Sequence, residues 1–174
     1  MNKRRLDGIW NIQFPMKLGW GVLMIKYKSY GKLPKEFYGV KGSFFNKPHG
    51  GLWGCRGEEW RDWCLCEQFE VKKLKHYFYF KLKKNSKVYR IRTKKDFINL
   101  CEKYPNYSEN TIDFIEMAKD YDAVEVVGDI VYKLRFGVEE NKLGFNMAGH
   151  GLYVWDVPSI CVLNPEKAEI IKGK

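Results

Sequence analysis

The chain has 174 residues, of which 45% are hydrophobic and 16% aromatic, enough apolar material for one domain with a packed core. This composition excludes an intrinsically disordered chain, and no apolar run reaches the roughly 18 residues that a membrane-spanning helix requires. The net charge of +10 favours an acidic partner, either a nucleic acid or a negatively charged protein surface.

The N-terminus is basic, but no apolar segment of signal-peptide type follows it, because Gln13, Pro15 and Lys17 interrupt the run. The five cysteines are an odd number without the spacing of a disulfide framework, which is typical of a reducing compartment. Only Cys64 and Cys66 lie close in sequence, and the three histidines are scattered. We therefore expect a cytoplasmic protein without a metal site.

The first elements in chain order are an extension and a strand. Residues 1–21 are interpreted as an N-terminal extension and residues 22–174 as a single domain. Residues 22–27 predict a first strand, rich in apolar side chains, that ends at the polar cluster of residues 28–30. Residues 37–45 fit either a short strand or an irregular connection.

A glycine-rich stretch follows at residues 46–55 (NKPHGGLWGC). Glycines around a tryptophan indicate backbone that lies close to a ligand or to another strand. The stretch matches neither a dinucleotide-binding fingerprint nor a P-loop. Residues 58–67 predict a helix with an acidic first turn, and Trp60, Trp63 and Cys64 share one face that we expect to lie in the core.

The charge is concentrated in residues 72–95, which contain twelve basic residues, counting one histidine, and no acidic one. Residues 76–82 alternate between tyrosines on one side and phenylalanines on the other, and so predict a strand. Residues 88–91 predict the next strand, joined to it as a hairpin. The charge fits either a solvated outer face of two strands or an electrostatic footprint for phosphates.

Two helices are expected in the middle of the chain. Thr93, with Asp96 at the third helical position, predicts a capped helix that ends before Pro105. Its apolar face repeats at i, i+3, i+4 and i+7 and consists of Phe97, Leu100, Cys101 and Tyr104. Residues 110–119 predict a second helix. Its expected inward side chains are Ile112, Ile115 and Ala118.

The last third of the chain predicts mostly strands. Residues 123–127 predict one strand, with residues 130–135 as its partner, and residues 139–149 predict a loop. Two apolar runs, 152–155 and 160–163, predict strands on either side of a corner.

Residues 168–171 predict a short final strand. Asp156 lies at the corner between the two preceding runs and fits either an ordinary turn residue or a carboxylate presented to a site. The order of elements predicts an α+β fold, rich in strands.

No sequential catalytic triad, metal-protease helix or carboxylate pair stands out. What remains is the polar cluster after the first strand, the Gly-Gly-Leu-Trp turn and Asp156, which lie far apart in sequence but converge if the sheet is split. A cleft lined by aromatic residues with a single carboxylate suits a reaction through an oxocarbenium ion, because the carboxylate stabilises the developing positive charge.

This layout resembles the small mono-ADP-ribosyltransferases of bacteria and phages, including phage enzymes that disable CRISPR effectors. The shared features are IKYKSYG at the first strand, KPHGGLWGC with the helix EEWRDWC, the strand YDAVEV, and the late corner WDVPSICVLNP. The resemblance covers residues 22–172. It implies a split antiparallel β-sheet core with a few flanking helices, and NAD as a substrate whose ADP-ribose is attached to a protein or a nucleic acid.

The resemblance also implies roles for individual residues. Asp156 takes the place of the late acidic residue, which orients the nicotinamide ribose and stabilises the oxocarbenium ion. The implied NAD-binding residues are Tyr27, Lys28, Ser29, Tyr30, Gly51, Leu52, Trp53, Trp63 and Ser159.

Within this set, the first-strand residues meet the ribose or the diphosphate, and Gly51 and Leu52 offer backbone groups to the nicotinamide amide. Trp53 lines that pocket, Ser159 supports the corner, and Trp63 substitutes for a stacking tyrosine. The chain departs from the family pattern in two ways. The late acidic residue is usually Glu, and the first strand usually carries His or Arg where this chain offers Tyr or Lys.

Two alternatives stay open. The first is a non-catalytic nucleic-acid-binding or inhibitor protein that uses the basic strands of residues 72–95. The second is an NAD-degrading enzyme with the same pocket and water as the acceptor. An enzyme requires Ser29, Trp53 and Asp156 to line one cleft, whereas a binding module leaves them scattered.

Overall fold

The computed structural model describes residues 25–106, 111–135 and 151–171. The described residues form a mixed α+β structure with antiparallel and mixed sheets and few helices, which confirms the expected class. The predicted extension over residues 1–21 and the predicted loop over residues 139–149 lie outside the described residues.

The first sheet is antiparallel and has three strands in the order β1-β5-β11. These strands are β1 (Lys26–Tyr30), β5 (Tyr77–Leu82) and β11 (Ala168–Ile171). The phenylalanines of β5 are buried and its tyrosines half-buried, as the alternation predicts. Because β5 pairs with β1 on one side and β11 on the other, the predicted hairpin with residues 88–91 is wrong.

The second sheet has four strands in the order β4-β10-β9-β6. These are β4 (Leu52–Gly54), β10 (Ser159–Val162), β9 (Ala123–Val126) and β6 (Val88–Ile91). β10 is antiparallel to both of its neighbours, whereas β6 runs parallel to β9. A parallel pair needs a long crossover, which the helical segment between β6 and β9 supplies.

That crossover begins with helix α2 (Lys94–Lys103), whose capping box is present as predicted. The Thr93 hydroxyl accepts from the Asp96 backbone N–H, and the Asp96 carboxylate accepts from the Thr93 backbone N–H. All four residues of the expected apolar face are buried. The short strands β7 (Pro105–Asn106) and β8 (Thr111–Ile112) pair after the helix.

Helix α3 (Phe114–Met117) is much shorter than the helix expected over residues 110–119, because β8 occupies the start of that range and Asp113 caps the helix. The prediction that Ile115 points inward is wrong: its side chain is 50% exposed, and Phe114 and Met117 are buried instead. The helix therefore buries a different face from the one expected for a helix that starts at residue 110.

Two further strand predictions are wrong. Residues 130–135 do not pair with β9, because helix α4 (Ile130–Lys133) occupies them, after Gly128 turns the chain at a φ of +69°. Residues 152–155 form bends and turns, because β10 already has β4 and β9 as neighbours. Two of their apolar side chains, Leu152 and Trp155, are buried in the hydrophobic core.

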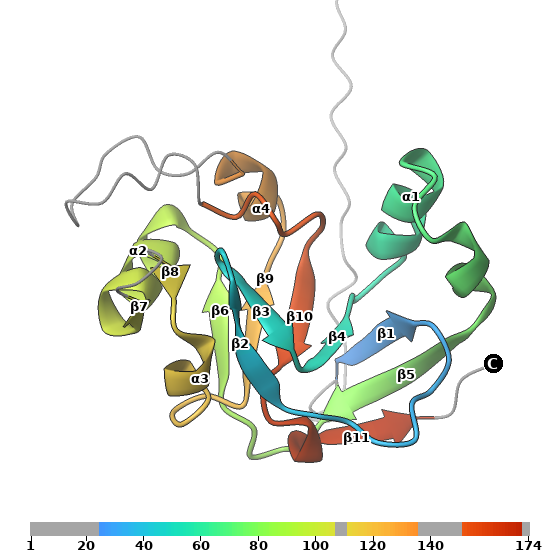
Figure 1. Cartoon of the computed structure of the whole chain (residues 1–174), viewed down its shortest axis with the longest axis horizontal. Helices are drawn as coiled ribbons and strands as arrows, with labels where there is room; N and C mark the ends of the chain where they lie inside the picture. Colours follow the sequence, from blue (N-terminus) through green and yellow to red (C-terminus); the bar gives the residue numbers. More distant parts are fainter. Residues whose placement is uncertain (1–24, 107–110, 136–150, 172–174) are drawn as a thin grey trace, which may run out of the picture.

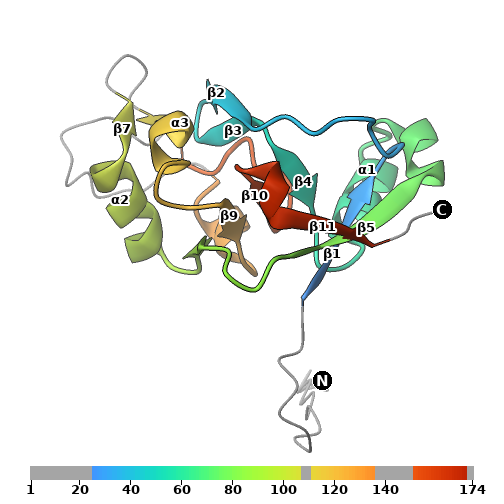
Figure 2. The ribbon, with the colours of Figure 1, turned by 90° about the horizontal axis from the view of Figure 1, so that it is seen from below.

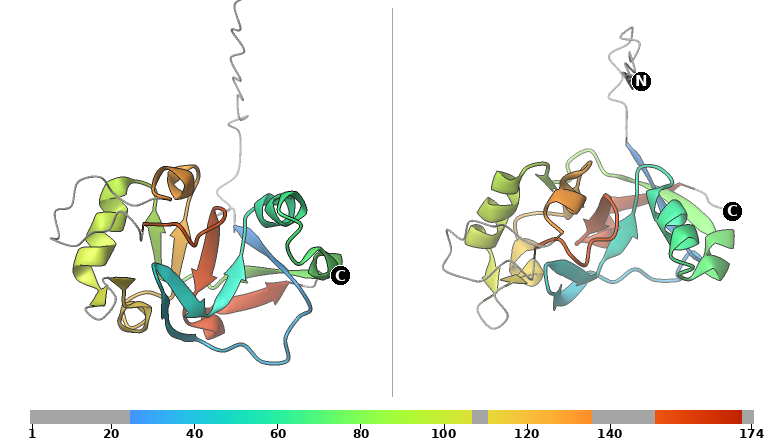
Figure 3. Two further views of the ribbon diagram at one scale, coloured as in Figure 1. Left: turned by 45° about the horizontal axis from the view of Figure 1, so that its top comes forward. Right: turned by 90° about the horizontal axis from the view of Figure 1, so that it is seen from above.

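The remaining elements lie beside the sheets. β2 (Val40–Phe44) pairs with β3 (Lys47–Gly50). Helix α1 (Glu59–Cys66) forms where expected and is followed by the 3-10 helix η1 (Val71–Lys75). In Figures 1, 2 and 3, α1 lies at one end of the molecule next to β1, whereas α2 and α3 lie at the other end, beside β6.

The hydrophobic core has two parts. One part lies between the four-stranded sheet and helices α2, α3 and α4, with Trp155 among its buried residues. The other lies between the two sheets, where Tyr27 and Phe80 from the first sheet pack against Leu52 and Ile160 from the second.

The two sheets meet at β1 and β4. Lys28 and Cys55 exchange backbone hydrogen bonds of 2.7 and 2.9 Å, which form an isolated bridge just beyond β4. From this bridge the sheets diverge, as Figure 1 shows. The fold therefore contains a split sheet, and its junction brings β1, β4 and the start of β10 close together.

Candidate functional site

A cavity of about 300 Å³ lies where the two sheets diverge. Its lining residues come from β1, β3, β4, α1, the segment before η1, η1 and the corner before β10. They are Lys28, Ser29, Tyr30, Lys47, Trp53, Gly54, Cys55, Trp60, Glu70, Lys73, Asp156, Val157 and Ser159. Ser29, Trp53 and Asp156 all line this cavity, as the sequence analysis requires of an enzyme.

Asp156 is fixed in this cavity by its neighbour in the chain. The indole N–H of buried Trp155 donates to the Asn46 backbone carbonyl at 2.5 Å, and its ring lies 5.0 Å from the Trp53 ring, edge on. On the other side of the corner, the Ser159 hydroxyl donates to the Val157 carbonyl at 3.0 Å. The turn that carries the carboxylate is therefore held from both ends.

The Asp156 carboxylate faces one cation. Lys47 Nζ lies 3.4 Å from its Oδ2 and also 5.3 Å from the centre of the Trp53 ring. That separation is longer than the 2.7–2.9 Å of a strong charge-assisted hydrogen bond. Among the described residues Lys47 is the only side chain bonded to this carboxylate, which therefore keeps acceptor capacity for a ligand.

The glycines around Trp53 serve the packing of strands. A Cβ at Gly51 would lie 2.6 Å from the Cys161 sulfur and 2.8 Å from the Val162 carbonyl oxygen, and one at Gly54 would lie 2.6 Å from the Phe80 ring. The sequence left open whether this backbone approaches a ligand or another strand, and within the described residues both glycines approach other strands. The close packing sets the position of Trp53 between them.

Lys28 is the most constrained cation of the cavity. Its side chain is 10% exposed, its Nζ lies 2.6 Å from Glu58, and the ring centres of Tyr30 and Tyr77 lie 4.8 and 4.3 Å away. Tyr30 also donates its hydroxyl proton to Glu58. This cluster ties the start of α1 to β1 and forms one wall of the cavity.

The cluster also shifts the acid–base behaviour of its members. Burial opposes the charged form of Lys28, but the hydrogen bonds to Glu58 and Tyr30 outweigh it and raise the pKa of Lys28 to about 12. The bond from Lys28 is the largest cause that lowers the pKa of Glu58 below its usual value. Burial, and then Glu58, raises the pKa of the Tyr30 phenol to about 12.

Helix α1 contributes an aromatic wall, but not through the residue that the sequence favoured. Trp60 lines the cavity, whereas Trp63 stacks on the far side of Trp60 with ring centres 5.0 Å apart and planes 22° apart. Phe69 packs edge on against both rings. Neither tryptophan is in the buried core, so the core prediction for this face is wrong except for Cys64.

The outer rim of the cavity carries an exposed ion pair. Lys73, at 62% exposure, is paired with Glu70, and both line the cavity. Glu70 adopts a left-handed backbone conformation with a φ of +45°, which a residue with a side chain rarely takes. A surface pair of this kind contributes little stability, so Lys73 can exchange its partner at low cost.

Four predicted site residues lie elsewhere. Tyr27 is buried between the sheets, Leu52 belongs to the same apolar cluster, and Gly51 packs against β10. Trp63 lies behind Trp60. None of the four lines the cavity, so their predicted contacts with NAD are not supported by this geometry.

Tyr27 instead belongs to a charge network around the buried carboxylate of Glu125. Its hydroxyl donates to Glu125 at 3.1 Å. Arg56 donates twice to the same carboxylate, at 2.6 and 2.8 Å, and Arg90 once, at 3.0 Å. The network joins β1 to β9 and β6 and thus links the two sheets below the cavity.

Sequence reasoning did not select Lys47, Trp60 or Lys73. Lys47 and Trp60 lie on either side of the Gly-Leu-Trp segment, where the sequence indicates only a turn around Lys47 and a buried helix face at Trp60. Lys73 was one of many lysines in the basic run, and no local pattern separates it from the others. The only signal for Lys47 was its place four residues before Gly51 in the stretch that the resemblance quoted.

The described residues contain no group of three or more His, Cys, Asp or Glu side chains arranged to hold a metal ion. No helix among them is both long and apolar enough to cross a membrane. All five cysteines are free thiols. No protein-family model, curated protein or solved structure matches the chain, so the interpretation of the site depends on its own geometry.

Proposed function

We propose that the protein is an NAD-dependent mono-ADP-ribosyltransferase that modifies a macromolecule. The observation that supports this most is that Asp156, Trp53, Ser29 and Ser159, from three separate parts of the chain, line one cavity. The division of the fold into two sheets with the cavity at their junction also supports the proposal, whereas the parallel pair of β6 and β9 departs from the antiparallel core that the resemblance implied.

The size of the cavity fits one end of the dinucleotide. Its volume of about 300 Å³ is at the lower limit of small-molecule sites, which span about 300–1,000 Å³. The nicotinamide and its ribose occupy the inside, and the diphosphate and adenosine extend past the rim. The indole rings of Trp53 and Trp60 offer flat apolar surface to the nicotinamide ring.

The chemistry assigned to this site is transfer of ADP-ribose. The bond between the nicotinamide nitrogen and C1 of the ribose breaks, and its electron pair leaves with neutral nicotinamide. The ribose carries positive charge as an oxocarbenium ion until a nucleophile of the acceptor bonds to C1 and loses its proton. A fixed carboxylate beside C1 lowers the energy of this charged state, which is the role of Asp156.

Three lysines line the cavity, and Lys47 is the one that faces Asp156. The other two differ in how well they can bind the diphosphate. Lys28 already has Glu58 and two tyrosine rings around its ammonium group, so its role is to hold the wall. Lys73 lies at the rim, and the one ion pair that its ammonium group makes with a described residue is with the exposed Glu70. We therefore assign the diphosphate contact to Lys73. In the family that the chain resembles, residues of the first strand are expected to make this contact.

The test is transfer of labelled ADP-ribose from NAD to cell lysate and to the protein itself. Asp156→Asn keeps the size of the side chain but removes its charge, and is expected to lower labelling by about 100-fold or more. Asp129→Asn, at the exposed carboxylate that precedes α4 outside the cavity, is the matched control and should label like the wild type.

Equal labelling by the wild type and by Asp156→Asn contradicts the role of Asp156. Release of free ADP-ribose without a labelled macromolecule would contradict the transferase and favour the alternative of an NAD-degrading enzyme that uses water as the acceptor. Absence of both labelling and free ADP-ribose, with protein shown to be folded by circular dichroism, contradicts the proposed activity.

A further inference from the structure

The three-stranded sheet has an outward face of which only the end at Lys28 and Tyr30 belongs to the cavity of the proposed reaction. Register places Tyr30 opposite Tyr77, Lys28 opposite Tyr79, and Lys26 opposite Lys81. Because side chains alternate along a strand, these six residues share the face that points away from the second sheet. Tyrosines thus fill one end of the face and lysines the other.

The surroundings of this face carry much of the positive charge of the chain. β1 (Lys26–Tyr30), residues 70–84 and residues 165–171 together hold nine lysines and three acidic residues. Lys83 continues the line of Tyr77, Tyr79 and Lys81 beyond the strand end, where its backbone N–H donates to the Lys167 carbonyl.

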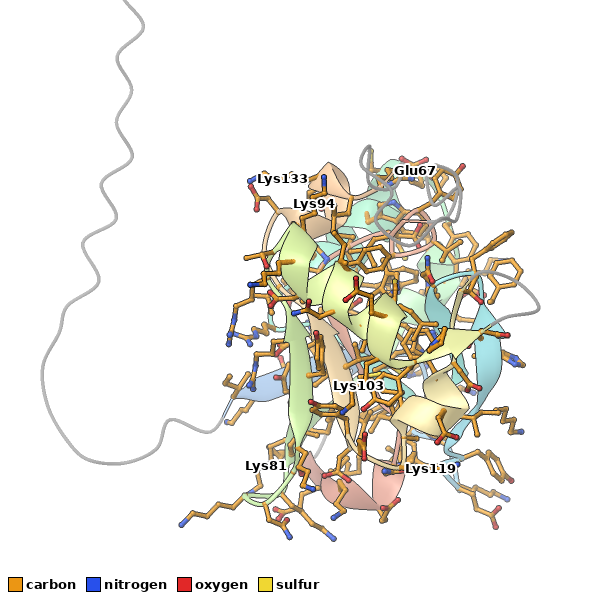
Figure 4. The ribbon with its side chains drawn as sticks, turned by 90° about the vertical axis from the view of Figure 1, so that its left-hand side faces the viewer. Glu67, Lys81, Lys94, Lys103, Lys119 and Lys133 are labelled. Carbon is orange, nitrogen blue, oxygen red and sulfur yellow. The ribbon has the colours of Figure 1, made fainter. Side chains whose placement is uncertain are left out.

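Several of these lysines have no acidic partner within the described ranges. Lys26, Lys83 and Lys84 are exposed and make no ion pair with any described residue, whereas Lys81 is paired with Glu169. The cation-rich end therefore carries charges that no described residue neutralises and that can bind an anionic ligand. In Figure 4, Lys81 lies at the lower edge of the molecule.

The face continues into the cavity. Lys28 and Tyr30 belong to both, since their side chains lie among the sheet tyrosines and also line the cavity. Lys73, on η1, lies at the rim on the same side of the molecule as the start of β5. A ligand along β5 would therefore reach the mouth of the cavity.

From this arrangement we infer that the outward face of the three-stranded sheet binds single-stranded nucleic acid, which is the acceptor of the ADP-ribose. The role of the nucleic acid as acceptor rests on the proposed function. The binding of nucleic acid to this face does not depend on it. Lysines alone would equally suit an acidic protein. The line of tyrosine rings next to the lysines distinguishes a nucleic acid, because unpaired bases stack on aromatic rings while lysines bind the phosphates.

The dimensions agree with a short single-stranded site. Six residues of β5 span about 20 Å at about 3.4 Å per residue. Proteins that bind single strands on sheets cover from about 4 nucleotides upward. A duplex would hide its bases from the tyrosines, so a single strand is expected to bind more tightly than a duplex of the same sequence.

The experiment measures binding by fluorescence anisotropy with a labelled 12-nucleotide DNA or RNA strand, without NAD, over a series of salt concentrations. The test variant is Lys83→Ala/Lys84→Ala. Its matched control is Lys94→Ala/Lys95→Ala, two consecutive lysines on α2 that are also exposed and make no ion pair with described residues. In Figure 4, Lys94 lies at the opposite end of the molecule from Lys81.

We expect the affinity of the wild type to fall steeply with salt, and the Lys83/Lys84 variant to lower the salt slope by about 1.4, since each phosphate contact contributes about 0.7. The Lys94/Lys95 control should keep the wild-type slope. Tyr79→Leu keeps apolar volume but removes the ring, and should weaken binding by about 5- to 150-fold with little change in slope.

Three outcomes overturn the inference: no salt-dependent binding, equal slopes for the two lysine variants, or equal affinity for single strand and duplex. Binding of a polyglutamate peptide as tightly as the oligonucleotide would assign the face to an acidic protein instead. Because the assay contains no NAD, these outcomes are independent of the labelling experiment that tests the enzyme.

Discussion

At the scale of single residues, two carboxylates near the sheet junction have opposite surroundings. Asp156 is partly open to the cavity and faces one lysine at 3.4 Å. Glu125 is 3% exposed and accepts four hydrogen bonds, from Arg56, Arg90 and Tyr27. A carboxylate with all its acceptor positions filled stabilises structure, whereas one with capacity left can bind a ligand.

We therefore predict that Glu125 is needed for stability. Glu125→Gln leaves two arginines beside an uncharged amide and should lower the free energy of unfolding by about 3 kcal/mol. Glu169→Gln, at a pair with Lys81 on an exposed edge, is the control and should change it by less than about 1 kcal/mol. Urea unfolding monitored by tryptophan fluorescence measures both, and equal effects would contradict the assigned role.

Tyr27 gives this network a pH dependence. Burial, reinforced by the Glu125 charge, raises the pKa of Tyr27 from its usual value of 10.0 to about 12. The unfolded chain releases the phenol proton first, so this contribution to stability is complete below pH 10 and is lost as the pH rises toward 12.

Tyr27→Phe should therefore remove part of the alkaline loss of stability, by about 1 kcal/mol at pH 11. Unfolding free energies of both proteins at pH 9 and pH 11 measure this difference. An identical alkaline loss in the two proteins would show that the Tyr27 phenol is not the buried group responsible.

At the scale of elements, the segment from β3 to β4 determines the cavity. Gly51 turns the chain between these strands with a φ of +71°, and the space for a Cβ is filled by β10. Gly128 has nearly the same φ, +69°, but open space around it. The two glycines therefore separate the cost of the backbone conformation from the cost of the contact.

We predict that Gly51→Ala destabilises the protein clearly more than Gly128→Ala, by more than about 1 kcal/mol beyond it. The reason is that the new methyl group meets Cys161 and the backbone of Val162, whereas the control has only the backbone strain. Thermal unfolding of the two variants compares them. Equal melting temperatures would mean that β4 and β10 separate easily, and that the cavity wall is not rigid.

Elements with strong local signals could be predicted from the sequence. The capping box of Thr93 and Asp96 located the start of α2, and the tyrosine–phenylalanine alternation located β5 and its buried side. Partners could not be predicted in this way. The short distance between β5 and β6 suggested a hairpin, yet they lie in different sheets, because β5 is covered on both edges by β1 and β11.

In the candidate site, too, the local structure could be predicted from the sequence but the neighbours of individual residues could not. Lys28 to Tyr30 and Ser159 line one cavity, as expected, because β1 and the start of β10 meet near the junction. The first strand, however, includes residues 28–30 and does not end before them, as the sequence suggested. Gly51 and Leu52 were misplaced, because the sequence could not show whether the glycine approaches a ligand or a strand. Trp63 was preferred to Trp60, because helical periodicity identifies a face but not the neighbour that the face meets.

At the scale of the whole molecule, the split between the two sheets organises both proposals. The cavity lies at the junction, with Asp156 on the side of the four-stranded sheet and Lys28 on the side of the three-stranded sheet. The charge is distributed unevenly across the same division, since the lysine-rich face belongs to the three-stranded sheet. A reaction at the junction, on an acceptor bound along β5, uses both halves of the fold.

The central claim is that Asp156 promotes cleavage of the bond between nicotinamide and ribose. The most direct measurement is the rate of nicotinamide release from NAD by purified protein, followed by chromatography with and without lysate as a source of acceptors. We predict release by the wild type and by Asp129→Asn, and a rate lower by about 100-fold or more for Asp156→Asn. Nicotinamide release at the wild-type rate by Asp156→Asn, or no release by any of the folded proteins, would contradict it.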